Sequence, residues 1–186
     1  DRFDWLHLHH EDFTGQYGKF WGSFRNETWY IRQQLESEKL AAEMGYAKVS
    51  REKLAVAEEI KRYITDGGFV FAMCSATDAF DIALSAHRTD ICASVFDGDP
   101  VDPDFQSRLD FGNTLAFTDF NLIPDPAVYE FSDIDVPPSN MPRLRDPETD
   151  YFTLFEFSAK YDPVPAMLTQ NYVNVVKGFI GQTTMF

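Results

Sequence analysis

The sequence predicts an α/β domain built on a mainly parallel sheet that helices flank. Two observations support this fold class. Two short apolar runs, Phe3 to His10 and Phe69 to Cys74, are separated by long segments of helical character. The second run follows a helix and a Gly67-Gly68 break without polar interruption, which is typical of a parallel strand covered on both faces. The length of 186 residues fits one domain, so we expect residues 1–186 to form one unit.

The first half of the chain predicts one strand, one loop and two helices. Phe3 to His10 is expected to be a buried strand that ends at Glu11-Asp12. Residues 13–26 are rich in glycine and aromatic residues, and such a loop is either a packed flap or one wall of a site. Residues 27–44 contain strong helix formers and precede Gly45. The clearest helix spans residues 50–65, with Ser50 as its expected N-cap and one apolar face formed by Val56, Ile60, Tyr63 and Ile64.

The second half predicts more strand than helix. After a short helix at residues 77–86, an acidic loop is expected at residues 91–104. We expect the C-terminal half to be the more β-rich one, with a proline-rich irregular connection at residues 136–147. Strands are predicted for residues 114–120, 127–134, 151–158, 166–168 and 173–180.

Composition excludes some partners and leaves others open. The formal net charge of −14 repels phosphate backbones, so a nucleic acid is not an expected partner. No apolar run is long enough to span a membrane, and no signal peptide begins the chain, which leaves a cytoplasmic or periplasmic location open. Cys74 and Cys92 both lie in apolar contexts and are expected to be buried free thiols.

The end of the predicted strand at residues 69–74 is the first candidate site. A cysteine on a tight turn between a parallel strand and a helix can act as a nucleophile, because backbone N–H groups of the helix stabilise an oxyanion. Cys74 has this position, although Ala72 and Ala76 stand where such turns usually have glycine. The only histidine after Cys74 is His87, which we expect to be out of reach. The alternative is a buried Cys74 beneath a turn that Ser75, Thr77 or Asp78 caps.

The second candidate site follows the first strand. His9, His10, Glu11 and Asp12 lie at a strand end that should face the same sheet edge as Cys74. Imidazoles and carboxylates in such a cluster suit acid–base catalysis or a divalent metal, and a core histidine is the alternative for His7. We assign no metal or cofactor to the chain.

Two further motifs carry less information. Asp97, Asp99, Asp102 and Asp104 alternate as calcium ligands do, but the twelve-residue loop and its closing Glu are absent, so an ordinary acidic loop is expected. The stretch GFIGQTT at residues 178–184 lacks the GK[ST] ending of a P-loop and is interpreted as a turn.

The strand WLHLHH, the helix at residues 50–65, Gly67-Gly68 and the strand FVFAMC resemble the class I glutamine amidotransferase-like superfamily, and within it the ThuA-like domains. The phrases DWLHLHHEDFTGQYGKF, FAMCSATDAFDIAL, VYEFSDID and VVKGFIGQTT are similar to a Bacteroidetes family commonly labelled asparagine synthetase B. The resemblance implies a flavodoxin-like arrangement of the sheet. It also implies that an N-terminal strand and helix of the domain precede Asp1.

The resemblance does not imply that this chain has the activities for which those families are named. A glutamine-dependent asparagine synthetase has an N-terminal cysteine and an SGG-type loop, and neither is present here. The amidotransferase triad has a His-x-Glu pair downstream of its cysteine, and no histidine follows His87. We therefore expect an amidotransferase-like domain without an intact glutaminase triad.

Such a domain is expected to bind a small polar ligand, a sugar or an amide, at the carboxyl edge of its sheet. If it is an enzyme, we expect hydrolase- or lyase-type acid–base chemistry by His9, His10, Glu11 and Asp12 rather than a Cys74 acyl-enzyme. Ser75, Thr77 and Asp78 would contribute ligand contacts. The alternative function is a non-catalytic module that binds a protein partner.

Overall fold

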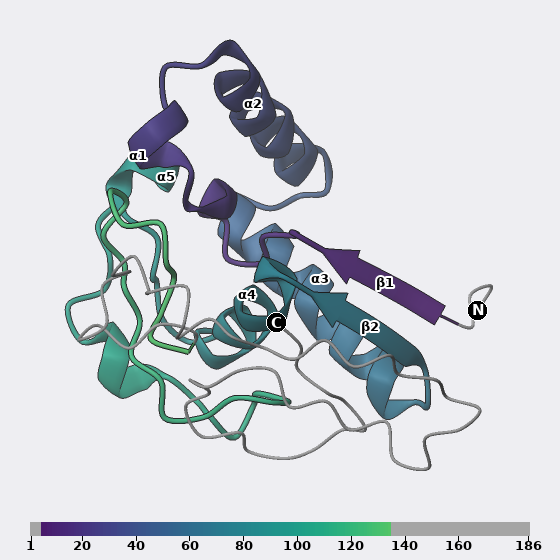
Figure 1. Cartoon of the computed structure of the whole chain (residues 1–186). Coiled ribbons are helices and arrows are strands. Elements are labelled where there is room, and N and C mark those ends of the chain that lie inside the picture. The colour runs from purple at the N-terminus through teal and green to yellow at the C-terminus, as the bar shows by residue number, and fades with distance from the viewer. Residues whose placement is uncertain (1–4, 135–186) are drawn as a thin grey trace, which may run out of the picture.

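The structure is a computed structural model and describes residues 5–134. Its centre is a parallel two-stranded sheet of β1 (Trp5–His9) and β2 (Phe69–Met73), whose register runs from Trp5 opposite Phe69 to His9 opposite Met73. Figure 1 shows the two strands side by side, with α3 (Val49–Thr65) behind them and α4 (Ser75–Ser85) next to the end of β2. The predicted combination of helices with a parallel sheet is thus confirmed for the described residues.

One face of this sheet forms the principal core. Leu8 of β1 is buried, and the partly buried Leu6, Val70 and Ala72 lie on the same side. These side chains pack against α3 and α4 in a cluster that contains Ala57, Ile60, Ala76, Ala79, Phe80, Ala83 and Leu84. Because side chains alternate along a strand, the even-numbered residues of both strands bury their side chains together.

The opposite face of the sheet is exposed among residues 5–134. The exposed fractions are 60% for Trp5, 57% for Phe69 and 43% for Phe71. The prediction that β2 is covered on both faces is therefore wrong for the described part of the chain. An unbroken apolar sequence is compatible with a strand that is covered on both faces. It is equally compatible with a strand whose aromatic side chains on one face are exposed to solvent.

The helices follow the sequence closely, with shifts at their ends. α2 (Thr28–Glu43) confirms the helix predicted at residues 27–44 and lies away from the sheet (Figure 1). α3 begins at Val49, so Lys48 occupies the N-cap position and the prediction of Ser50 as the N-cap is wrong. Gly67 follows α3 with a φ of +95°, as expected for the left-handed residue after a helix. The predicted short helix is α4, which begins two residues earlier than expected.

The glycine- and aromatic-rich loop contains two short helices that the sequence did not predict. These are η1 (Tyr17–Lys19) and α1 (Trp21–Phe24). The buried Lys19 connects this loop to a segment that is distant in sequence. Its Nζ donates hydrogen bonds to the carbonyl oxygens of Ile123 at 2.6 Å and Asp125 at 2.8 Å. The loop is therefore a packed part of the domain.

Residues 114–134 do not form the two strands that the sequence predicts there. Neither residues 114–120 nor residues 127–134 form a strand, and an isolated antiparallel bridge joins Leu122 to Ser132. Backbone N–H groups of residues 115–117 donate instead to the buried carboxylate of Asp81, so they need no partner strand. The predicted strands at residues 151–158, 166–168 and 173–180 lie outside the described residues.

Two short helices, α5 (Ser94–Asp97) and η2 (Phe105–Arg108), interrupt the remaining connections. Within the described part of the chain, no helix is both long and apolar enough to cross a membrane.

Candidate functional site

The carboxyl ends of β1 and β2 bring Cys74 and His10 together. The register places His9 opposite Met73, so the next residue of each strand emerges at the same sheet edge. Cys74 Sγ lies 3.1 Å from His10 Nε2. This distance is within hydrogen-bonding range for a thiol and an imidazole. The sequence placed both residues at this edge but did not reveal their pairing, because His10 precedes Cys74 by 64 positions along the chain.

Cys74 lies on a strained turn between β2 and α4. Its backbone angles are φ 55° and ψ −143°, a combination that a non-glycine residue rarely adopts. Thr77 fixes the turn by donating its backbone N–H and its hydroxyl to the carbonyl oxygen of Cys74, at 3.1 and 2.7 Å. The turn forms with Ala72 and Ala76 in the flanking positions, so glycine is not needed there. Cys74 is exposed, and the prediction that it is a buried thiol is wrong.

His9 orients the imidazole of His10. The Nδ1 atoms of the two rings are 2.7 Å apart, and the ring planes are nearly perpendicular, at 84°. His10 has a left-handed backbone with φ 57°, which turns its side chain away from the strand direction and towards Cys74. The carboxylate of Glu11 accepts a hydrogen bond from the backbone N–H of His9 and so closes the turn. Cys74, His10 and His9 form a chain of three contacting side chains.

The other predicted site residues have structural contacts. Asp12 accepts hydrogen bonds from the backbone N–H of Thr14 at 2.8 Å, from its hydroxyl at 2.6 Å and from the N–H of Gly18 at 3.3 Å. It therefore organises the start of the aromatic loop. Ser75 is the first residue of α4, whereas Asp78 is buried within the first turn of that helix.

The remaining histidines, His7 and His87, do not contact Cys74 or His10 in the described part of the chain, although the ring centroids of His7 and His9 are 6.5 Å apart. His7 is on the exposed face of the sheet, with its ring centroid 5.3 Å from that of Phe71. His7 is thus not the core histidine that the sequence allowed. His87 Nδ1 lies 3.1 Å from the carbonyl oxygen of Leu84, within its own turn.

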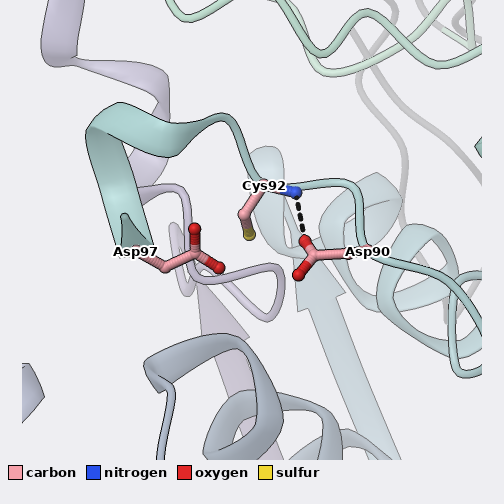
Figure 2. Close-up of side chains that lie close together, drawn as sticks. All are labelled: Asp90, Cys92 and Asp97. Atoms are coloured by element: carbon pink, nitrogen blue, oxygen red, sulfur yellow. Dashed lines mark hydrogen bonds between the residues drawn. The ribbon is translucent and has the colours of Figure 1, made fainter. Parts of the chain in front are cut away.

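A different group of residues has the spacing of metal ligands. Among the described residues, Asp90, Cys92 and Asp97 are the group whose potential ligand atoms all lie within 4.8 Å of one another. Figure 2 shows the two carboxylates on either side of the thiol, with the N–H of Cys92 bonded to Asp90 at 2.9 Å. Burial raises the pKa of the Cys92 thiol well above its usual value, which disfavours the thiolate that a metal requires.

Lys48 supplies the cation that these carboxylates need. Its Nζ lies 2.6 Å from Asp90, 3.1 Å from Asp97 and 2.6 Å from Asp99. Desolvation opposes the charged ammonium, but hydrogen bonds to the three carboxylates raise the pKa of Lys48 above its usual value. Part of the acidic loop is therefore an ion-pair cluster around a lysine. The sequence did not identify this cluster because Lys48 lies far from Asp90 along the chain.

A cavity of about 300 Å³ adjoins the candidate site. Its polar wall comes from three elements, namely the turn after β1, α2 and α3. The polar side chains that these elements contribute are those of His10, Glu11, Asp12, Gln33, Ser37 and Lys53, and the aromatic loop adds Tyr17. The volume is at the lower end of the range found for small-molecule sites.

Comparisons with known proteins leave the family resemblance a prediction. No family model, no curated protein and no solved structure matches the chain.

Proposed function

We propose that this domain is a hydrolase of small amide or ester substrates, with Cys74 as the nucleophile and His10 as its base. The observation that carries the proposal is the 3.1 Å contact between the exposed Cys74 Sγ and His10 Nε2. A nucleophile within hydrogen-bonding reach of a base, itself oriented by a third group, is the common arrangement of covalent hydrolases. The sequence favoured acid–base chemistry by the histidines and carboxylates rather than a Cys74 acyl-enzyme, and it is the contact with His10 that now favours Cys74 as the nucleophile.

His9 selects the tautomer that the reaction needs. The Nδ1 atoms of His10 and His9 are 2.7 Å apart. If the proton of the neutral His10 ring is on Nδ1 and forms a hydrogen bond to Nδ1 of His9, then Nε2 of His10 is a hydrogen-bond acceptor. His10 Nε2 then takes the thiol proton, and the resulting imidazolium keeps its hydrogen bond to His9. His9 thus has the role of a positioning residue.

The turn after Cys74 supplies the oxyanion site. Ser75 begins α4, and the first N–H groups of a helix have no acceptor within it. The thiolate attacks the substrate carbonyl, and the backbone N–H of Ser75 is placed to stabilise the oxyanion. The leaving group departs with a proton from His10. Water, deprotonated by His10, then hydrolyses the thioester and restores the thiol.

Alkylation kinetics test the pair directly. Iodoacetamide should modify Cys74 at neutral pH at least about tenfold faster in the native protein than in His10→Ala, because the base is lost. His9→Ala should slow the reaction less. Cys92 is an internal control, since it is buried in the same molecule and peptide mass mapping should find it unmodified. Equal Cys74 reactivity in the native protein and in His10→Ala would refute the proposal.

A second candidate function is a protein-interaction module. The open aromatic face of the sheet, formed by Trp5, Phe69 and Phe71, favours it. This function requires no reactive thiol. A slowly alkylated Cys74, together with loss of a pulled-down partner on Phe71→Ser substitution, would favour the interaction module over the hydrolase.

A further inference from the structure

We infer that the substrate's leaving group carries a carboxylate, which Lys53 binds in the cavity beside His10. This inference rests on the proposed hydrolase, and it adds the class of substrate. Amides and esters formed from small amino or hydroxy acids have such a leaving group.

The position of the cavity identifies it as the leaving-group side. His10 lines the cavity and contacts Cys74 through Nε2, whereas Cys74 does not line it. In the proposed reaction, the proton taken from the thiol passes from His10 Nε2 to the departing nitrogen or oxygen as its bond to the acyl carbon breaks. The departing group must therefore lie beside His10, which is where the cavity begins.

The cavity wall carries two carboxylates, those of Glu11 and Asp12, and one ammonium, that of Lys53, so Lys53 is where an anion would bind. Asp12 already accepts hydrogen bonds with both of its oxygens, from Thr14 and Gly18. Glu11 accepts one from the backbone of His9. The Nζ of Lys53 lies 3.5 Å from the carboxylate of Glu52, which is buried, so Lys53 also balances this charge. Its ammonium has three donors, so at least one remains for a ligand.

The rest of the cavity suits a short organic acid. Val49, Lys53 and Val56 are spaced along one face of α3, so the ammonium projects between apolar side chains. Gln33 and Ser37 face it from α2 and offer further hydrogen bonds. A cavity of about 300 Å³ accommodates a small ring or chain with one carboxylate.

Two esters that differ only in the leaving group test the inference. Phenyl acetate and 3-carboxyphenyl acetate have the same acyl group. The native protein should hydrolyse the carboxylated ester with a kcat/KM at least about tenfold higher, because a charge-assisted hydrogen bond is worth at least one factor of ten. Lys53→Met should abolish this preference, so that the two esters are hydrolysed with the same kcat/KM. Lys53→Arg should retain the preference, as should the exposed control Lys39→Met.

The outcomes separate the two proposals. Hydrolysis of both esters that depends on Cys74 and His10 but shows no preference would overturn the role of Lys53 and leave the hydrolase standing. If neither ester acylates Cys74, the hydrolase itself fails. Calorimetric titration with 3-hydroxybenzoate, the carboxylated product, provides a readout without turnover. Binding that is equal in the native protein and in Lys53→Met, or absent from both, also overturns the inference.

Discussion

Replacement of the buried Lys19 should change how the stability of the domain depends on pH. Lys19 is 2% exposed, and its Nζ donates to two backbone carbonyls. Desolvation lowers its pKa from 10.5 to about 8, although Asp125 and Glu130 oppose the shift. The unfolded chain therefore keeps a proton on Lys19 over a pH range in which the folded chain has lost it.

The sign and size of the effect follow from proton linkage. Stability rises with pH wherever the unfolded state binds more protons. For Lys19 this interval runs from a pH of about 8 to the usual lysine pKa of 10.5. Between pH 7 and pH 9.5, the native protein should gain about 2 kcal/mol relative to a variant without this group, since one pKa unit corresponds to about 1.4 kcal/mol.

Urea unfolding of the native protein and of Lys19→Met at pH 7, 8.5 and 9.5 measures this gain. Burial raises the pKa values of Tyr17 and Tyr30, which lowers stability at high pH, but both tyrosines are present in both proteins. The difference between the two free energies of unfolding therefore isolates Lys19. A difference that does not change with pH would show that the ammonium is not desolvated, whereas the exposed control Lys39→Met should show no pH-dependent difference.

Three further substitutions test other contacts. Asp81→Asn should lower the free energy of unfolding by about 2–4 kcal/mol, because a buried carboxylate that accepts three backbone N–H groups is lost; a loss no larger than that of the exposed Asp119→Asn would contradict this. Gly68→Ala should cost about 1–3 kcal/mol in urea unfolding, since its Cβ would lie 2.3 Å from the Tyr63 ring, and an unchanged midpoint would show that the ring moves away freely. Lys48→Met should lower the thermal midpoint more than Lys39→Met does, because it leaves three carboxylates without their ammonium; equal midpoints would assign the cluster no net stabilisation.

Local sequence signals were sufficient to predict the positions of the helices and of the two strands in the sheet. Strong helix formers located α2, periodicity located α3 and Gly67 marked the end of α3, because these features depend on residues within a few positions of one another. The failures at residues 114–120 and 127–134 have a different cause. Their alternating apolar residues suggested strands, yet the backbone groups of residues 115–117 are bound by Asp81 from α4, a contact that local patterning cannot reveal.

The sequence predicted which residues form the candidate site, but it did not predict the contacts between their side chains. The sequence placed His9, His10 and Cys74 at one sheet edge because parallel strands end together. It did not reveal the left-handed backbone of His10, which directs the imidazole to Cys74, or the tolerance of the turn for Ala72 and Ala76. Lys53 was missed because it is one of several lysines on the helices and carries no motif.

The parallel register of β1 and β2 has a consequence for folding. His10 and Cys74 are separated by more than sixty positions along the chain, so their contact forms only after a long loop has closed. A slip of the register by one residue would direct the side chains of β1 to the wrong face and separate the pair. The enhanced reactivity that His10 is expected to give Cys74 should therefore appear late in refolding, at the rate at which β1 docks, and it can serve as a kinetic probe of that event.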